Sequence, residues 1–526
     1  MKTKKYIFRQ FLKIALFTSA IFLLSHHAIS QKNVLELLPG AEKFEYNEKT
    51  GVHRLIGRVN FIYQGNTMYC DSAHYKDKSQ EVWAYGNVHI TKSDVNLFCD
   101  SLYYNGTTKQ AKLWINVRVR DLEYKILTDT LEYDANKAVA IYRYGGRIES
   151  IVKSETLTSK IGHIYTESKD MFFSGKVVYR STDLYMTTDT LRYNYKKKTN
   201  YFYGPTNITQ IEKDPKKGSK IYCENGWYNT ETKEATLQKK ASILKESQLM
   251  KGDYLYSHSQ KGISIGKGNV IFKDTTENLE FRGDYVYSSD LKKLSFLTGK
   301  ALVLKIDKKD TLFIHADTLF SLKDSLGKSN RMKGYKNVKI FRKELQAKCD
   351  SISYDKTIGE MELYKDPIVW VKAKTELKGD YIEVFFKNDT IIEKANVLGN
   401  ATVLFEIDSG KYYNQIGGKE IFSFFKNNDI YRTDVKGNAR TISFPENTEK
   451  TDTAVVIKRL GMNRIYASDL RVYIDSNEVE GITYLEKPDG IFYPMNKLNA
   501  EEQFIKGFKW LAVLRPKNWK EILINN

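Results

Sequence analysis

The sequence is poor in proline, cysteine and histidine. Its 526 residues include 8 Pro, 4 Cys and 8 His. Proline lacks a backbone N–H and interrupts strand ladders, so its scarcity permits long, regular β-pairing. The 36 Tyr and an aromatic content of 13% are typical of pleated, half-buried strands. The composition therefore favours an all-β chain.

The sequence motifs of metal and nucleotide chemistry are also missing. None of the histidines forms H-x-H or H-E-x-x-H, and no P-loop is present. The Gly-Gly-x-Gly-x-Asp nonapeptide of calcium-binding β-rolls does not occur. We also find no cluster of facing carboxylates of the kind that a carbohydrate-active enzyme needs. We therefore expect no enzymatic activity, no cofactor and no bound metal.

The first thirty residues have the pattern of a secretory signal peptide. Five positive charges and no acid precede the apolar run at 14–24, and small residues follow before Gln31. The apolar run is shorter than the roughly 20 residues that cross a bilayer, which makes a membrane anchor the weaker interpretation. We therefore expect cleavage before Gln31 and a location in the periplasm, either free or in association with an outer membrane.

The chain is basic. Its formal net charge is +19, and +14 without the five positive charges of the signal segment. Interspersed lysines and aspartates fit a solvated β surface, and an excess of positive charge also favours anionic partners. Secretion argues against nucleic acid as that partner, so an anionic glycolipid or membrane surface is the better candidate.

A short sequence recurs about every 30 residues. It is built on a small residue followed by an acid, and it starts at positions 70 (CDSAHY), 99 (CDSLYY), 128 (TDTLEY), 188 (TDTLRY), 223 (CENGWY), 252 (GDYLYS), 283 (GDYVYS), 316 (ADTLFS), 349 (CDSISY) and 379 (GDYIEV). A second marker alternates with it at positions 57 (GRVNF), 86 (GNVHI), 175 (GKVVY), 268 (GNVIF), 299 (GKALV), 399 (GNATV) and 437 (GNARTI). Two interleaved markers with one period predict an elongated repeat array.

Each repeat contains two turns, so the strands should be antiparallel. Polar breaks follow both markers, for example at 92–94 and at 105–107. Short turn sequences between alternating runs indicate hairpins. A parallel β-helix would not need these reversals. We interpret the repeated acid as a corner residue that breaks the alternation of side chains, and the four cysteines as small buried fillers.

One face of the second marker is apolar. Because alternate residues of a strand share a face, Val88, Ile90 and their counterparts in the other repeats should point inward. The predicted interior residues are Val59, Phe61, Val88, Ile90, Val177, Tyr179, Val270, Phe272, Ala301, Val303, Val338 and Ile340.

The C-terminal part departs from the repeat. We divide the chain into a signal peptide (1–30), two stretches of repeats (31–215 and 216–442), an inserted loop with the last strands (443–498) and a tail (499–526). Asn499 with Glu502 predicts an N-cap, and Pro516 a stop, for a short helix over about 500–514. That helix should cap the open end of the array. Alternatively it docks a partner or touches a membrane through Trp510 and Trp519.

The repeat resembles the OstA-like family, the periplasmic module of lipopolysaccharide export represented by LptA and the N-terminal part of LptD. Gly86-Asn87-Val88 and Gly268-Asn269-Val270 match the first element of that family's unit, and 99–104 and 316–319 match the second. The resemblance covers roughly 36–440. It implies an open, V-shaped β-jellyroll whose interior residues hold the acyl chains of lipopolysaccharide.

The resemblance further implies other Lpt-type envelope proteins as partners, joined end to end by β-strand addition. The chain is longer than a typical LptA and lacks the large C-terminal barrel of LptD. The leading interpretation is therefore a non-enzymatic lipid-transport scaffold for outer-membrane assembly. The alternative is a secreted β-repeat adhesin or envelope-assembly scaffold that binds protein or glycan.

Overall fold

The structure is a computed structural model. It describes residues 36–524 except 64, 93, 123, 169, 195, 212–217, 230, 259, 308–309, 325–328, 388–390, 428, 451–454 and 476–477. The predicted signal peptide lies outside these residues. The described part consists of β-strands with a few short 3-10 turns, so the all-β class is confirmed. No helix in this part has the length and hydrophobicity that a bilayer crossing requires.

The chain forms two compact units, which divide after Gln260. The strands of the first unit are β1 (Glu36–Leu38), β2 (Lys43–Asn47), β3 (Val52–Tyr63), β4 (Asn66–Lys76), β5 (Glu81–Lys92), β6 (Val95–Asn105), β7 (Gln110–Arg120), β8 (Tyr124–Asp134), β9 (Val139–Tyr142), β10 (Gly146–Ser150), β11 (Thr156–Ser159), β12 (Ile161–Tyr165), β13 (Asp170–Arg180), β14 (Leu184–Asn194), β15 (Thr199–Gln210), β16 (Ser219–Asn229), β17 (Glu234–Lys245) and β18 (Gln248–His258).

The second unit is built in the same way. Its strands are β19 (Ile263–Asp274), β20 (Leu279–Ser289), β21 (Leu294–Ile306), β22 (Thr311–Lys323), β23 (Ser329–Arg342), β24 (Leu345–Asp355), β25 (Glu360–Tyr364), β26 (Ile368–Val371), β27 (Thr375–Lys378), β28 (Tyr381–Lys387), β29 (Ile391–Ile407), β30 (Tyr412–Lys426), β31 (Asp429–Ser443), β32 (Glu446–Lys450), β33 (Val455–Arg459), β34 (Gly461–Asp475), β35 (Glu478–Leu485) and β36 (Asp489–Pro494).

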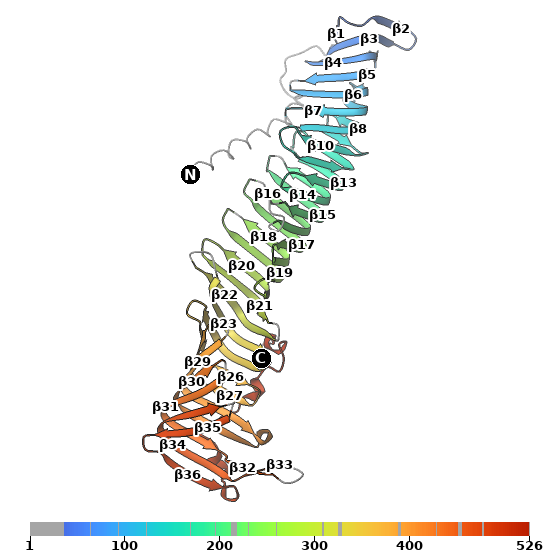
Figure 1. Cartoon of the computed structure of the whole chain (residues 1–526). Coiled ribbons are helices and arrows are strands. Elements are labelled where there is room, and N and C mark those ends of the chain that lie inside the picture. Colours follow the sequence, from blue (N-terminus) through green and yellow to red (C-terminus); the bar gives the residue numbers. More distant parts are fainter. Residues whose placement is uncertain are drawn as a thin grey trace, which may run out of the picture. The chain divides into compact units, whose positions relative to one another are not determined.

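Consecutive strands pair antiparallel within each unit, as the two turns per repeat predict. β4, for example, lies between β3 and β5, and β22 lies between β21 and β23. Figure 1 shows the strands side by side like rungs. Some rungs are split into two short strands, as in β9 with β10 and β25 with β26. The antiparallel repeat array is therefore confirmed.

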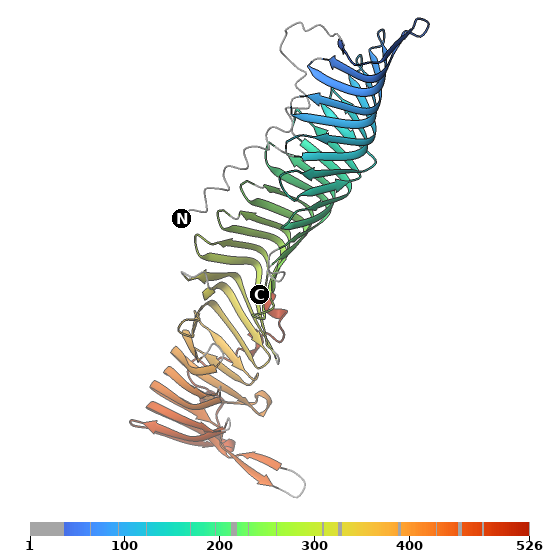
Figure 2. The same cartoon turned by 45° about the horizontal axis from the view of Figure 1, so that its top comes forward.

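Most strands bend near their middle, so that each unit has two walls (Figure 2). Wall A carries the row Leu55, Ala73, Ala84 and Leu102, and wall B carries the pairs Val59–Cys70 and Val88–Cys99. In the second unit, wall A includes the pair Leu297–Leu319 and wall B the pair Val303–Ile314. No pairing among the described strands joins the walls at their outer margins. The sheet is therefore open on the side away from the bends.

The two walls bury their facing side chains in one continuous cluster per unit. In the first unit this cluster extends from Leu55 to Leu255, and in the second from Leu297 to Val472. We call the face that carries these residues the inward face and the opposite face the outward face.

The interruption at 443–466 contains a hairpin. β32 and β33 pair only with each other among the described strands, and form a separate two-stranded sheet. β31 pairs directly with β34, so the hairpin is an excursion between two neighbouring rungs.

The predicted C-terminal α-helix is not confirmed. Residues 495–524 form 3-10 turns at Met495–Lys497, Ala500–Gln503, Ala512–Leu514 and Glu521–Leu523. Gly507, with φ +83°, breaks the helical path inside the predicted segment. A helix of about 15 residues is marginal by itself, so contacts with the sheet decide the conformation.

The tail follows the outward face of wall B instead of capping the array. Ile505 is buried with Leu404, Ile442 and Met462. Further along the tail, Ile522 is buried between Leu302 and Leu304, which flank the inward Val303. The sequence also suggests Trp510 and Trp519 as anchors for a partner or a membrane. In the structure both contact this chain's own sheet: Trp510 contacts Tyr413, and Trp519 stacks on Phe313 at 5.4 Å.

Candidate functional site

The bend that joins the two walls comes from the Gly-Asn marker. In β5, Tyr85 pairs with Ser101 and Val88 with Cys99, so Gly86 and Asn87 face only the single residue Asp100. Both have positive φ, +73° for Gly86 and +45° for Asn87. Two residues against one is a β-bulge, and repetition of the bulge in successive strands turns the whole sheet. The repeated acid of the first marker is the single residue of each bulge.

Glycine at this corner is required by space as well as by φ. A Cβ on Gly86 would lie 2.4 Å from a carboxylate oxygen of Asp71. The equivalent contact recurs between Gly399 and Asp380, at 2.3 Å. The repeated acid therefore has a structural role, as the sequence predicts.

At four corners the acid accepts a hydrogen bond from the corner asparagine of a later strand. The amide Nδ2 donates to the carboxylate at 2.8 Å for Asn87 and Asp71, 3.1 Å for Asn116 and Asp100, 3.1 Å for Asn337 and Asp317, and 3.1 Å for Asn400 and Asp380. At two other corners the same link is an ion pair, Lys240 with Glu224 at 2.8 Å and Lys365 with Asp350 at 3.2 Å.

The four cysteines lie beside these corners on the inward face. Cys70, Cys99, Cys223 and Cys349 are all buried and none forms a disulfide. Burial raises the pKa of the Cys70, Cys99 and Cys349 thiols to about 12 and that of Cys223 to about 11. A thiol with so high a pKa is a poor nucleophile. Cys70 and Cys99 are separated by β5, which places them two strands apart.

All of the predicted interior residues lie on strands of the two units, and they divide into two groups. Nearest the bend, the residues are fully enclosed: Val59, Val88, Val177, Val270, Ala301 and Val338. Two positions farther along each strand, Phe61, Val303 and Ile340 are still buried, whereas Ile90, Tyr179 and Phe272 are only partly buried. The bend is thus the floor of a trough, which opens toward the strand ends. Their contact with lipid remains a prediction.

Sequence patterns missed the inward residues of the neighbouring strands. The bulge changes the alternation there, so that Cys99 and Leu102 both point inward although they are three residues apart. The partly buried side chains on these strands include Met68, Leu97, Tyr104, Tyr124 and Met250. Together with Ile90, Tyr179 and Phe272 they form what we call the rim of the trough.

Methionine is concentrated on the inward face. Met68, Met171, Met186 and Met250 belong to or pack against the cluster of the first unit, and Met332 and Met361 pack against that of the second. Methionine has an unbranched, polarisable side chain that adapts to irregular apolar partners. The trough therefore has an adaptable lining.

One cation is held at the rim of the first unit. Lys92 follows Val88 and Ile90 on the same face of β5 and is opposite Val95. Burial lowers its pKa, because the charged ammonium loses hydration there. An anionic group beside Lys92 would stabilise the charged form of its ammonium group.

Two observations bear on catalytic chemistry. No group of three or more His, Cys, Asp and Glu among the described residues is placed to hold a metal ion. A G-x-S-x-G sequence occurs at 262–266, and its serine, Ser264, pairs with Ser288 in the β19–β20 ladder. The nucleophile elbow of hydrolases is a strained strand-to-helix turn. Ser264 lies instead within a regular antiparallel pair of strands.

Comparison with known proteins supports the resemblance for the N-terminal part. Residues 37–189 match the family model described as OstA-like protein, which confirms the resemblance of this part of the chain to that family. No curated protein matches the sequence.

Among solved structures, the chain is similar to LptH of Pseudomonas aeruginosa, described as the LptA-homologous periplasmic component of the lipopolysaccharide transport device. The identity is 17%, the match covers 21% of this chain and 76% of that one, and the TM-score is 0.19.

Proposed function

We propose that the protein is a periplasmic, non-enzymatic scaffold that carries lipopolysaccharide for outer-membrane assembly, with the acyl chains in the trough. The observation that supports this most strongly is the open, apolar, methionine-rich trough in each unit. The OstA-like match over 37–189 is consistent with this role. The twelve predicted interior residues would then form the floor and part of the rim that the lipid contacts.

The physical chemistry of the trough suits a carrier. Burial of an acyl chain is worth about 0.8 kcal/mol per CH₂ group, so a dozen methylenes can hold a lipid without a catalytic or metal centre. The fully enclosed floor leaves little space, which directs the acyl chain to the rim. Lys92 would meet the anionic headgroup region at the edge of the trough.

The proposed partners are other Lpt-type envelope proteins. In the first unit, β1 and β2 form an edge that pairs only with β3 among the described strands. β2 also exposes Phe44 and Tyr46. An exposed edge with apolar side chains is suited to the addition of a strand from another protein.

A photo-crosslinking experiment tests the carrier function. A crosslinking amino acid at Ile90 or Phe272, on the rim, should trap lipopolysaccharide in cells. The same amino acid at His89 or Asn269, on the neighbouring outward or corner positions, should not. If both groups trap lipid equally, the trough is not the site. Capture of protein or glycan alone at all four positions would favour the adhesin-like or envelope-assembly scaffold instead.

A further inference from the structure

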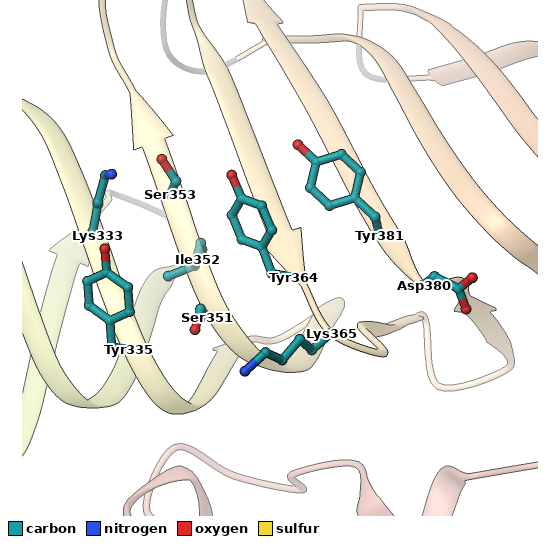
Figure 3. Close-up of a pocket in the computed structure, with 9 residues that line it drawn as sticks. All are labelled: Lys333, Tyr335, Ser351, Ile352, Ser353, Tyr364, Lys365, Asp380 and Tyr381. Atoms are coloured by element: carbon teal, nitrogen blue, oxygen red, sulfur yellow. The ribbon is translucent and has the colours of Figure 1, made fainter.

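A row of tyrosines crosses the outward face of wall A in the second unit. The cross-strand register places Tyr335 of β23 opposite Ser351 of β24, Ser351 opposite Tyr364 of β25, and Tyr364 opposite Tyr381 of β28. The rings of Tyr364 and Tyr381 are 5.1 Å apart. Figure 3 shows the three rings in line, with their hydroxyl groups pointing the same way.

The serine of β24 opens a gap in what is otherwise continuous aromatic packing. Next to it, the rings of Tyr287, Phe296, Phe320 and Tyr335 contact one another in sequence at 5.4, 5.7 and 5.6 Å. At β24 the outward positions are Ser351 and Ser353. Tyr335 and Tyr364 are thus separated by about two strand spacings, roughly 9.6 Å. The result is an open hollow of about 650 Å³, which is within the size range of small-molecule sites.

A carboxylate fixes the tyrosine hydroxyl groups. Tyr381 donates a hydrogen bond of 2.5 Å to Glu362 Oε1. Burial acts to raise the pKa of Glu362, but hydrogen bonds from Tyr381, Tyr364 and Ser353 and the charge of Lys333 lower it on balance. Glu362 is therefore an ionised acceptor held among hydroxyl groups. The rings are oriented before any ligand arrives.

We propose that this hollow, which we call the tyrosine hollow, binds an uncharged hexopyranose ring of a glycan. The apolar C–H face of a sugar can stack on the tyrosine rings, while its hydroxyl groups exchange hydrogen bonds with Ser351 and Ser353, which also line the hollow. Aromatic faces beside a few convergent polar groups are the combination that such a ligand needs.

The charges at the hollow favour a neutral sugar over an anion. Lys365 is engaged by Asp350 at 3.2 Å, and Asp380 is engaged by the corner amide of Asn400. Lys333 is among the groups that lower the pKa of Glu362, so this carboxylate is ionised. An incoming anion would be repelled by its negative charge. An anionic headgroup would therefore be disfavoured here, in contrast to the rim at Lys92.

The tyrosine hollow is independent of the proposed lipid trough, because it lies on the opposite face of the sheet. Two sources present the same chemistry, namely the sugar part of a glycolipid and a free polysaccharide. The site would hold the sugar portion outside while the trough holds acyl chains, or it would bind envelope polysaccharide alone.

Saturation-transfer NMR and calorimetry with the purified chain test the proposal. The probes are the methyl glycosides of glucose, galactose and mannose, maltohexaose, and the polysaccharide released from lipopolysaccharide by mild acid. At least one probe should bind, with the largest transfer to its ring C–H protons. Binding of the released polysaccharide alone would identify the glycolipid source, whereas binding of maltohexaose or the methyl glycosides would identify a general glycan site.

Two variants separate the hollow from the rest of the surface. Tyr364→Ala should weaken binding about tenfold, since one stacking ring is lost. Ser351→Tyr should fill the gap, extend the aromatic row and abolish binding without loss of stability. Tyr203→Ala, which removes an exposed outward tyrosine of the first unit, should have no effect.

The proposal is overturned by any of three results. These are failure of every probe to bind, binding that is unchanged in both Tyr364→Ala and Ser351→Tyr, or displacement of the sugar by inorganic phosphate, which would indicate an anion site. None of them affects crosslinking of lipid at Ile90, so failure here is distinguishable from failure of the carrier function.

Discussion

The side-chain amide of Asn87 donates a 2.8 Å hydrogen bond to the carboxylate of Asp71, which lies on the strand before it. Asn87 belongs to one of the two repeated markers and Asp71 to the other. The two markers alternate in the sequence because they are the two halves of one corner. The hydrogen bond at such a corner links one strand to the next. This link explains why the two markers recur while other residues of the repeat vary.

The corner predicts the effect of a minimal substitution. Gly86→Ala places a methyl group 2.4 Å from the Asp71 carboxylate and also puts a non-glycine residue at φ +73°. Strain of this kind costs on the order of 1–3 kcal/mol. We expect faster amide hydrogen exchange in β4–β6, with little change in distant rungs, because each rung contacts mainly its neighbours.

Gly65→Ala is the matched control for Gly86→Ala. Gly65 has φ +77°, yet no atom lies within 4 Å of its added Cβ. It should therefore show only the cost of φ. The double variant Gly86→Ala with Asp71→Ala should recover part of the loss. If Gly65→Ala and Gly86→Ala destabilise equally, close packing against Asp71 has no role.

The repeat made much of this fold predictable from the sequence. The glycine of the second marker fixes the corner, so that Val59, Val88 and Val270 necessarily follow it on the inward face. Prediction failed on the other strands because the bulge at the acid shifts the alternation, and Met68 and Leu97 were missed. Exposure of the rim could not be predicted either, since it depends on how far the two walls separate.

Removal of one tail side chain should weaken wall B of the second unit. Ile522 is 0% exposed and fills the space between Leu302 and Leu304. Ile522→Ala should cost about 2–5 kcal/mol, the usual range for a large-to-small change in a core. Hydrogen exchange in β21 and β22 should rise. Val513→Ala, in the same tail but 87% exposed, should change stability by no more than about 0.5 kcal/mol. Equal effects of the two variants would show that the tail does not dock.

The docked tail also predicts a dependence on pH. Glu376 is buried beneath it and accepts hydrogen bonds from Leu511 N at 2.9 Å and Trp370 Nε1 at 3.0 Å. Burial raises the pKa of Glu376 despite these bonds. In the folded state the group therefore binds a proton more tightly than in the unfolded state. Its contribution to stability is fully present below the unfolded pKa, about 4.5, and is lost as pH rises through the raised folded pKa.

Glu376→Gln should remove this dependence, because glutamine retains an acceptor and carries no charge. The melting temperature of the variant, relative to the native chain, should increase between acidic and mildly alkaline pH. Glu501→Gln, on the exposed part of the tail, should leave the profile unchanged. A native profile in Glu376→Gln would contradict the assignment of the titration to Glu376.

The docked tail and the tyrosine hollow are two features that sequence patterns could not predict. The contacts of the tail join residues far apart in the chain, such as Leu511 and Glu376. The hollow depends on Ser351 standing between Tyr335 and Tyr364, and only the strand register brings these three residues together. Local periodicity predicts the faces of a strand, but it does not predict which strands become neighbours on a face.

The carrier function predicts opposite outcomes for one negative charge on the two faces of a strand pair. Ile90→Asp places a carboxylate on the rim, where it remains partly hydrated when the trough is empty. The fold should therefore persist, with a melting temperature within a few degrees of the native value. When an acyl chain covers this position, the carboxylate loses its hydration without a partner. Capture of lipopolysaccharide by the purified chain should fall by tenfold or more.

Asn96→Asp provides the matched charge on the outward face. Asn96 pairs with Thr91, next to Ile90, and its side chain already accepts a hydrogen bond from the His89 ring at 3.0 Å. The substitution is nearly isosteric, so lipid capture should stay at the native level. Val88→Asp, on the floor, should instead unfold its own rungs, because Val88 is enclosed whether or not lipid is present. If Ile90→Asp and Asn96→Asp capture lipid equally well, the rim does not hold acyl chains and the trough is only a structural core.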